Sequence, residues 1–317
     1  MANVATQSRT EAGAKRPEGA AARSFRQFRE VVGGNPSFAF GYLFLAALII
    51  LSILVPWISP YEPTTADPAA YLQPPSAAHW LGTDNTGMDI LTRILYAPRV
   101  DLVIALVGTL ASALIGAPLG AVVGYYERRG GGRRVLSTVV MRAADVLQAF
   151  PVFVFAIALV AVFGQSIASI VLAIAFVNVP IYLRLMRTQV LTVSSMRYVE
   201  AAYIAGASDF AIIRRHIIPN SIAVALAQLS VNVGWAVLLT AALSFVGAGV
   251  VAPTPEWGSM IAAGFQNIVT GQWWPSVFPG MALALTVFAF GLVGASIETL
   301  ADPRQRGIAG ASAKAGH

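Results

Sequence analysis

The sequence predicts an all-α, polytopic membrane protein with six transmembrane helices. Two properties of its composition support this fold class: 56% of the 317 residues are hydrophobic and only 11% are charged, whereas soluble domains usually carry about 25% charged residues. The third observation is that the apolar residues fall into uncharged stretches, each close to or above the length of about 20 residues that a helix needs to cross a bilayer. A water-soluble protein is therefore not expected.

The first uncharged stretch covers residues 38–58, and a cleaved signal peptide is the competing interpretation. A signal peptide would have an apolar core of about 7 to 15 residues followed by small residues at a cleavage site. Here Pro56 and Trp57 follow instead, so we expect a first membrane span. Only Gln165 and Ser166 mark the boundary between the third and fourth spans. The five further spans are expected at residues 102–126, 146–164, 166–183, 221–251 and 277–297.

The distribution of lysine and arginine predicts the orientation of the spans, because basic residues are retained on the cytoplasmic side. With the N-terminus inside, every basic residue except Arg93 and Arg99 falls in a terminal tail or an inside loop. We therefore expect both termini in the cytoplasm. We predict a mostly disordered tail at residues 1–35, with a short surface helix around residues 25–32. The transmembrane domain is predicted at residues 36–304, with an external segment at 59–101 and a cytoplasmic loop at 189–220. A cytoplasmic tail follows at residues 305–317.

The sequence lacks the residues that would power transport within the chain itself. None of the six stretches contains Asp, Glu, Lys, Arg or His, although gradient-driven carriers usually need such groups inside the membrane. The only lysines, Lys15 and Lys314, lie outside any glycine-rich phosphate loop, so the chain is not expected to be an ATPase. A transporter without either device must receive work from another subunit through a cytoplasmic surface.

Other chemistries are also disfavoured by the composition. The chain has no cysteine, which excludes disulfides, thiolate metal sites and cysteine nucleophiles. Its net charge of +6 comes from short basic clusters between apolar runs, without the interleaved aromatic residues of a nucleic-acid groove. His216 has no second ligand or nucleophile at a useful spacing, so it is expected to pack at a helix end rather than to bind metal.

The cytoplasmic loop contains the segment YVEAAYIAGASDFAIIRRHIIPN at residues 198–220. Its residues predict two short helices separated by a turn, because Gly206 can end the first helix and Ser208 can cap the second. Asp209 complements the positive end of the second helix, and Pro219 is expected to stop it where the fifth span begins. Another protein could approach closely at the small residues Ala201, Ala202, Ala205 and Ala207.

This segment resembles the EAA loop of binding-protein-dependent ABC importer permeases, in which Glu-Ala-Ala, a later glycine and a hydrophobic residue followed by proline recur at fixed spacing. The matching residues are Glu200, Ala201, Ala202, Gly206, Ile218 and Pro219. The resemblance implies a type I ABC importer permease fold and a coupling helix in this loop that docks in a cleft of an ATPase subunit. The alternative is an ordinary amphipathic interfacial loop.

Further segments narrow the resemblance to the C-type permease subunit of dipeptide, oligopeptide and nickel ABC importers. Residues 79–102, HWLGTDNTGMDILTRILYAPRVDL, are similar to the signature HPLGTDxxGRDxxSRxxxGxRxSL, although Met88 stands where an arginine is usual. The charged pattern is kept at Asp84, Asp89, Arg93 and Arg99. Other similar segments are residues 243–260, 273–280 and 301–304.

The resemblance implies a set of partners. A homologous B-type permease would pair with this chain in the bacterial inner membrane, among membrane lipid, with two ATP-binding subunits on the cytoplasmic side and a substrate-binding protein outside. ATP and Mg would be bound by the ATPase subunits, and no cofactor, metal, catalytic residue or nucleic-acid partner is expected for this chain. The solute would be a peptide or a related small molecule. The runner-up hypothesis is a channel or scaffold without ATP coupling.

Several polar residues are candidates for the translocation path and the external gate. Gln228, Asn232 and Trp235 lie at helical spacing on the fifth span, and Asn178 adds a polar group on the fourth. They would line the passage or, equally, form hydrogen bonds between helices. Candidates for the gate or for contact with the binding protein are Asp84, Asp89, Arg93, Arg99, Glu256 and Trp257.

Each of these candidates has a purely structural alternative. Asp84 and Asp89 could brace Arg93 and Arg99 instead of contacting a partner, and Glu256 could lie in a solvated turn. The second span carries glycine at every fourth position, which predicts close helix packing. These glycines are Gly116, Gly120 and Gly124.

Overall fold

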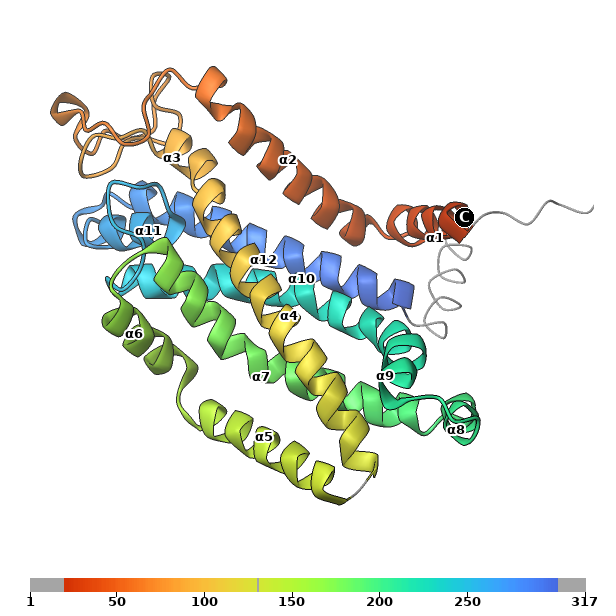
Figure 1. Ribbon diagram of the computed structural model, residues 1–317. Helices are drawn as coiled ribbons and strands as arrows, with labels where there is room; N and C mark the ends of the chain where they lie inside the picture. Colours follow the sequence, from red (N-terminus) through yellow and green to blue (C-terminus); the bar gives the residue numbers. More distant parts are fainter. Residues whose placement is uncertain (1–19, 130, 302–317) are drawn as a thin grey trace, which may run out of the picture.

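The computed structural model describes residues 20–129 and 131–301. Long helices lie side by side in one elongated bundle (Figure 1), and β-pairing in these ranges is confined to an isolated antiparallel bridge between Thr83 and Asp89. One end of the bundle holds α3, α11 and the long loop after α2, and we call it the α3–α11 end. The opposite end holds α8 and α9, and we call it the α8–α9 end. The all-α fold predicted from the sequence is confirmed.

The helices are, in chain order, α1 (Ala20–Gly33), α2 (Pro36–Ile58), the 3₁₀ turn η1 (Pro68–Ala70), α3 (Ile90–Tyr96), α4 (Pro98–Arg129), α5 (Gly131–Ala149), α6 (Val152–Phe163), α7 (Ile167–Ser194), α8 (Arg197–Ile204), α9 (Asp209–Ile212), the π-helical turn η2 (Ile213–Ile217), α10 (Ile218–Phe245), α11 (Trp257–Phe265), the 3₁₀ turn η3 (Ile268–Thr270) and α12 (Trp274–Ala301). Helix α1 contains the predicted surface helix at residues 25–32 and is longer than expected. The remainder of the predicted N-terminal tail, residues 1–19, and the predicted C-terminal tail, residues 305–317, lie outside the described residues.

Five helical stretches in the described residues are long and apolar enough to cross a membrane, and a sixth is present if the bent pair α5 and α6 counts as one span. The five are Pro36–Ile58, Ile90–Arg128, Ile167–Ser194, Asp209–Phe245 and Trp274–Leu300. The chain therefore has the apolar helices of a multi-pass membrane protein. The predicted six spans are found only when the bent pair is included.

The third span differs from the prediction of one uninterrupted helix at residues 146–164. The structure breaks there, and α5 and α6 meet at an angle of 90°. Pro151 explains the break, because it has no N–H to donate and disfavours helical geometry at the preceding Phe150. Helix α6 has 12 residues and is therefore only about 18 Å long, so it does not cross a bilayer by itself.

The fifth span also ends earlier than predicted, at Phe245 rather than near Val251. Gly247 has a left-handed backbone with φ of +83°, which glycine adopts without steric cost. The Gly247 N–H donates to the Ser244 carbonyl, and the Ala248 N–H donates to the Leu243 carbonyl. These two hydrogen bonds form a Schellman motif, which stops the helix.

The closest packing in the bundle joins α4 to α7, and the glycines on α4 permit it. A β-carbon added at Gly116 would lie 2.5 Å from the Val179 carbonyl oxygen, and one at Gly124 would lie 2.8 Å from the Arg187 carbonyl oxygen. A β-carbon at Gly120 would clash with the Leu183 carbonyl. The predicted packing role of this glycine ridge is confirmed.

Several helices extend beyond the uncharged stretches of the sequence and take in ionisable residues. Asp101 lies in the first turn of α4 and is buried. Arg184 and Arg187 lie on α7, and Glu298 lies near the end of α12. The predicted spans were free of charge, but the helices that contain them are not.

Candidate functional site

The α8–α9 segment is a helix–turn–helix whose geometry follows from its local sequence. Gly206 has φ of +81° and donates its N–H to the Tyr203 carbonyl, while the Ala207 N–H donates to the Ala202 carbonyl. This pair of hydrogen bonds is a Schellman motif, which ends α8. The Ser208 side chain then accepts the Ala211 N–H at 3.3 Å and caps α9. The predicted turn between two short helices is confirmed.

The prediction for Pro219 is wrong. Helix α9, η2 and α10 form one continuous helical run from Asp209 to Phe245, and Pro219 lies inside it. The π-helical turn accommodates the proline, since the Ile218 N–H reaches back five residues to the Ile213 carbonyl. A π-turn changes the hydrogen-bonding register of a helix, so the missing N–H of Pro219 does not end it. The α8–α9 segment is therefore joined to α10 without a flexible link.

The α8–α9 segment is tied to the bundle by polar and apolar contacts. Asp209 accepts a hydrogen bond from the Tyr125 hydroxyl of α4 at 2.9 Å and pairs with Arg133 of α5 at 2.6 Å. Buried Ile212 and Ile217 join a hydrophobic cluster with α4 and α7 side chains. Because three helices hold the segment, a force applied to it is transmitted to the bundle as a whole.

The four small residues predicted to face a partner do not share one environment. Ala201 and Ala205 are exposed, as are Glu200 and Ser208. Ala202 and Ala207 instead pack against the chain's own hydrophobic cluster. The reason is helical geometry, because the side of α8 that faces the bundle must also carry small residues to lie close to it.

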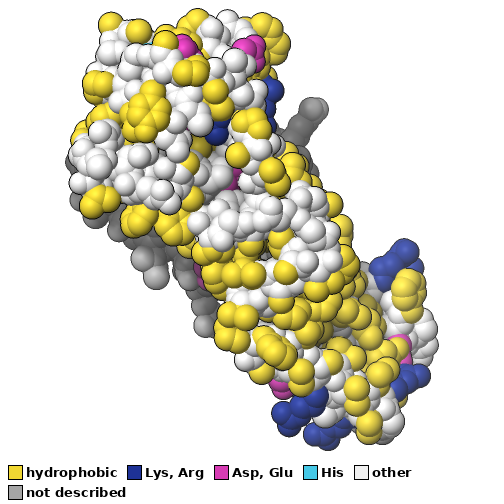
Figure 2. Space-filling model, turned by 90° about the vertical axis from the view of Figure 1, so that its left-hand side faces the viewer, with side chains coloured by type: hydrophobic (Ala, Val, Ile, Leu, Met, Phe, Trp, Pro, Cys, Tyr) yellow, Lys and Arg dark blue, Asp and Glu magenta, His cyan; other side chains and the backbone are white. Residues whose placement is uncertain are grey.

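The tip of this segment presents large apolar side chains to the outside. Ile204 is 79% exposed and Phe210 is 73% exposed, and Tyr203 is exposed beside them. Basic residues gather at this end of the molecule (Figure 2). Exposed apolar side chains on a rigid element, rimmed by charge, are typical of a surface that binds another protein.

Of the four candidate path residues, two are buried and two are partly exposed. Asn178 on α7 and Asn232 on α10 are buried, so neither lines an open passage in this conformation. Gln228 donates to the Asn232 side-chain oxygen at 2.7 Å, but this bond lies within one helix. Gln228 also lines a trough, described below, whereas Trp235 is half-buried against the central core.

The trough runs along α7, α10 and α12 toward the α8–α9 end. It consists of two adjoining hollows of about 410 and 540 Å³, which share Leu185, Gln189 and Val224. Gln228 and Glu298 line the larger hollow. Sequence reasoning missed Gln189 and Glu298, because each lies beyond the end of an uncharged stretch and only the folded helices bring them together.

At the α3–α11 end, the charged residues of the motif at residues 79–102 make contacts within the chain itself. Arg93 is buried and lies 3.6 Å from Asp84, and it donates hydrogen bonds to the carbonyls of Pro63 and Pro253. Asp84 therefore braces Arg93, one of the two roles that the sequence left open. Met88 places its sulfur against the Arg93 guanidinium.

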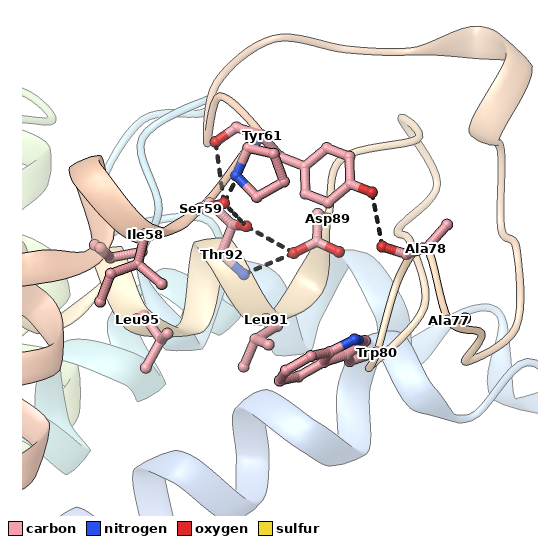
Figure 3. Close-up of a pocket in the computed structure, with 12 residues that line it drawn as sticks. Ile58, Ser59, Tyr61, Ala77, Ala78, Trp80, Asp89, Leu91, Thr92 and Leu95 are labelled. Carbon is pink, nitrogen blue, oxygen red and sulfur yellow. Dashed lines mark hydrogen bonds between the residues drawn. The ribbon is translucent and has the colours of Figure 1, made fainter.

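Asp89 also serves the structure of its own chain. It caps α3 by accepting the N–H and hydroxyl of Thr92 at 2.8 and 2.7 Å, and its other oxygen lies 3.0 Å from His79 Nδ1. Figure 3 shows Asp89 and Thr92 among the residues that line a pocket of about 330 Å³ between the end of α2 and α3. Within the described residues Asp89 pairs with His79 and with no arginine, so of the two roles left open for it, bracing Arg93 or Arg99 is not found.

Arg99, the remaining charge of the motif, fastens α4 to α2. Its guanidinium donates hydrogen bonds to the carbonyls of Ser52 and Ile53 at 2.9 and 3.2 Å, and it stacks over the Tyr96 ring at 5.0 Å. This gives the arginine a structural role between helices.

Glu256 and Trp257 are fully buried, which excludes the solvated turn considered for Glu256. Glu256 caps α11 by accepting the N–H groups of Gly258 and Ser259 at 2.8 and 2.7 Å. Burial raises the pKa of Glu256, while these backbone N–H groups act in the opposite direction. Buried Asp101 of α4 accepts the Trp257 N–H at 3.2 Å. Neither Glu256 nor Trp257 is placed to touch a partner in this conformation.

Comparisons with known proteins agree on one family. A family model described as binding-protein-dependent transport system inner membrane component matches residues 116–307. A second, described as the N-terminal TM domain of oligopeptide transport permease C, matches residues 22–75. Together these two matches cover most of the described residues and leave out residues 76–115, which hold α3 and the first part of α4.

Three curated relatives are similar over most of their length. A probable D,D-dipeptide transport system permease of Escherichia coli K12 is 38% identical over 86% of this chain and 90% of its own. A dipeptide transport system permease of Alkalihalophilus pseudofirmus is 36% identical, covering 84% of this chain and 85% of the relative. A glutathione transport system permease of Pectobacterium atrosepticum is also 36% identical, covering 83% and 85%.

Proposed function

The chain belongs to the family of binding-protein-dependent transport system inner membrane components, and from this premise we propose how it is assembled and driven. Members of this family are the translocation subunits of ABC importers, and this chain is one of them. We propose that it pairs with a homologous B-type permease, receives solute from an external substrate-binding protein, and is moved by two ATPase subunits that bind ATP and Mg. The chain itself would need no cofactor and catalyse no covalent step.

The proposed orientation places the α8–α9 end in the cytoplasm and the α3–α11 end outside. Basic residues support this, because the loops and tails that would lie inside carry all of them except Arg93 and Arg99. Those two arginines are bound within the α3–α11 end, so neither acts as a free charge that would hold this end inside. Both termini would then be cytoplasmic.

One observation carries the proposed coupling to an ATPase: exposed Ile204 and Phe210 sit at the tip of a segment that is continuous with α10 and anchored by Asp209. Apolar side chains held out from a rigid element bind a groove at low entropic cost. Movement of the bound partner would carry α10 with it and change the angle of the helices, which is a rigid-body route to alternating access.

We propose short peptides as the solute class. The support comes from the relatives, which are named for D,D-dipeptide, dipeptide and glutathione transport. All three names describe small molecules that contain amide bonds and charged ends. The wall of the path in this subunit would include Gln228, which lines the trough.

The test of ATP coupling uses the absence of native cysteine. In proteoliposomes containing the complete importer, a single cysteine introduced by Ala205→Cys should cross-link to an ATPase subunit through a thiol-to-amine reagent. Val269→Cys at the opposite end is the control and should give no such product. Uptake of a dipeptide should require both the ATPases and ATP. Equal uptake without the ATPases would support the ATP-independent channel and refute the proposal.

A further inference from the structure

The trough on α7, α10 and α12 contains polar side chains on helices of membrane-spanning length. Gln189 comes from α7, Gln228 from α10 and Glu298 from α12. A polar side chain in such a position faces protein or water rather than lipid, because exposing it to hydrocarbon is costly. The trough floor is α10, and small or branched side chains keep it open. These floor residues are Ala223, Val224, Ala227 and Val231.

The charged residues of the trough are not equivalent. Arg184 pairs with Asp145 at 2.7 Å and also donates to the Gln148 side chain, so neighbours neutralise its charge. Glu298 is exposed, and no residue in the described ranges forms an ion pair with it. Among the described residues, the larger hollow therefore presents one carboxylate without an ion-pair partner, beside the side-chain amides of Gln189, Asn220 and Gln228.

The position of Glu298 strengthens this negative potential. It lies in the last turn of α12, which ends at Ala301 and has no basic residue in that turn. The C-terminal end of a helix carries partial negative charge, so a cation is stabilised there and an acidic side chain is not. The Glu298 carboxylate does not stabilise its own helix at this position. A cationic ligand therefore explains its presence better than helix stability does.

We propose that this trough binds the translocated solute on its way out, and that the solute class is a peptide with a protonated amino group. The Glu298 carboxylate would pair with the ammonium group of a lysine side chain in the peptide. Gln189 and Gln228 each offer both a donor and an acceptor, which matches the N–H and C=O groups of a peptide bond. The inference rests on the proposed function, because it assigns a substrate preference to the same path.

A first experiment measures the charge of the trough without transport. In the full-length chain, which has no native cysteine, Gln228→Cys is modified by a cationic and by an anionic methanethiosulfonate reagent. The ratio of the cationic to the anionic rate is divided by the same ratio for a free thiol in solution, because the thiolate itself favours the cationic reagent. This normalised ratio should be about twofold to fivefold, the range expected for one partly screened charge, and adding Glu298→Gln should bring it close to one.

The matched control for this experiment is Glu30→Gln. Glu30 lies on α1, at the same end of the bundle (Figure 1), and it is exposed with Arg26 as its neighbour at 3.6 Å. The variant removes the same charge from the same side of the molecule but outside the trough, so the reagent preference should survive. A preference that persists in Glu298→Gln, or that disappears equally in Glu30→Gln, overturns the assignment of the charge to the trough.

A second experiment tests the solute. The complete importer in proteoliposomes is given alanyl-lysine or alanyl-aspartate, and the ratio of their uptake rates is compared between wild type and Glu298→Gln. The binding protein is the same in both, so its own selectivity cancels. The ratio should fall about twofold to fivefold in the variant and stay unchanged in Glu30→Gln. An unchanged ratio with normal ATP-driven uptake overturns this inference alone, whereas loss of ATP dependence in wild type overturns the proposed function.

Discussion

Both ends of the bundle contain ion pairs, but the pairs differ in burial and in what they hold. At the α3–α11 end, Arg93 and its partner Asp84 are shielded from solvent, and Glu256 is completely buried. At the α8–α9 end, Arg133 of the pair with Asp209 remains mostly exposed. At the α3–α11 end the charged side chains bind the loops of their own chain. At the α8–α9 end the charged side chains lie at the surface around the exposed apolar tip.

This difference separates an end whose charged side chains are buried from an end whose charged side chains are exposed. Buried charges are costly unless they are paired or hydrogen-bonded, and at the α3–α11 end Arg93 pairs with Asp84 while Glu256 accepts two backbone N–H groups. The α8–α9 end instead exposes Ile204 and Phe210 on the segment that runs into α10, where we propose that an ATPase subunit binds. Substitutions at the two ends should therefore affect different quantities: stability at the first and coupling at the second.

The largest expected effect on stability comes from Arg93→Ala. This change leaves Asp84 without its partner and the carbonyls of Pro63 and Pro253 without a donor. Breaking a buried pair from one side typically costs about 3 to 5 kcal/mol. Denaturant unfolding of the chain in detergent, followed by tryptophan fluorescence, measures the loss.

The control for this prediction is Arg128→Ala at the α8–α9 end, where the arginine is exposed. Its effect on the free energy of unfolding should stay within about 0.5 kcal/mol, as for most surface substitutions. Equal losses in the two variants would contradict the contrast between a buried and an exposed set of charges.

The α8–α9 turn could be predicted from sequence because its signals are local. Gly206 and Ser208 act on backbone groups within a few residues of themselves, so their pattern identifies both the turn and the cap. Pro219 shows the limit of the same logic. Its usual effect is to end a helix, but the π-turn before it changes the register, and a sequence pattern does not distinguish these outcomes.

The contacts that sequence reasoning missed join residues far apart in the chain. Glu256 has the sequence context of an exposed loop residue, and the packing of α11 against α10 and α12 buries it near Asp101 of α4. Glu298 follows an uncharged stretch like an ordinary flanking charge, and it becomes part of a trough only when α12 lies beside α10. Helix existence follows from composition, whereas the environment of a polar residue follows from tertiary packing.

The second prediction concerns coupling to the ATPase, with the stability of the chain left unchanged. Ile204→Asp and Phe210→Asp place a charge on side chains that are exposed in this chain, so the free energy of unfolding should change by no more than about 0.5 kcal/mol. ATP-driven uptake by the complete importer should fall about tenfold or more, because apolar anchors dominate the energy of protein interfaces. Uptake and unfolding are measured on the same preparations.

Val269→Asp is the matched control, since Val269 is 91% exposed in η3 at the opposite end. It should change neither quantity. If the Ile204 and Phe210 variants import solute at the wild-type rate, the tip is not the surface that receives the work of the ATPase.

The smallest expected effect concerns pH at the α3–α11 end. Burial raises the pKa of Glu256, so the folded chain binds a proton at this carboxyl more tightly than the unfolded chain does. Stability therefore falls as pH rises from the unfolded pKa through the folded one. Glu256→Gln cannot titrate, yet its side-chain oxygen can still accept one backbone N–H of α11, so this variant should unfold with a flatter pH dependence.

Glu62→Gln provides the comparison for that slope, because Glu62 is an exposed carboxylate at the same end of the molecule. Amide hydrogen exchange in α11, measured between about pH 5 and pH 8, reports the local opening that a global unfolding curve averages out. Wild type and Glu62→Gln should show opening that increases with pH, and the increase should be weaker in Glu256→Gln. A wild-type slope retained in Glu256→Gln would mean that the buried carboxyl is not what makes this end sensitive to pH, and the contrast between the two ends would then rest on Arg93 alone.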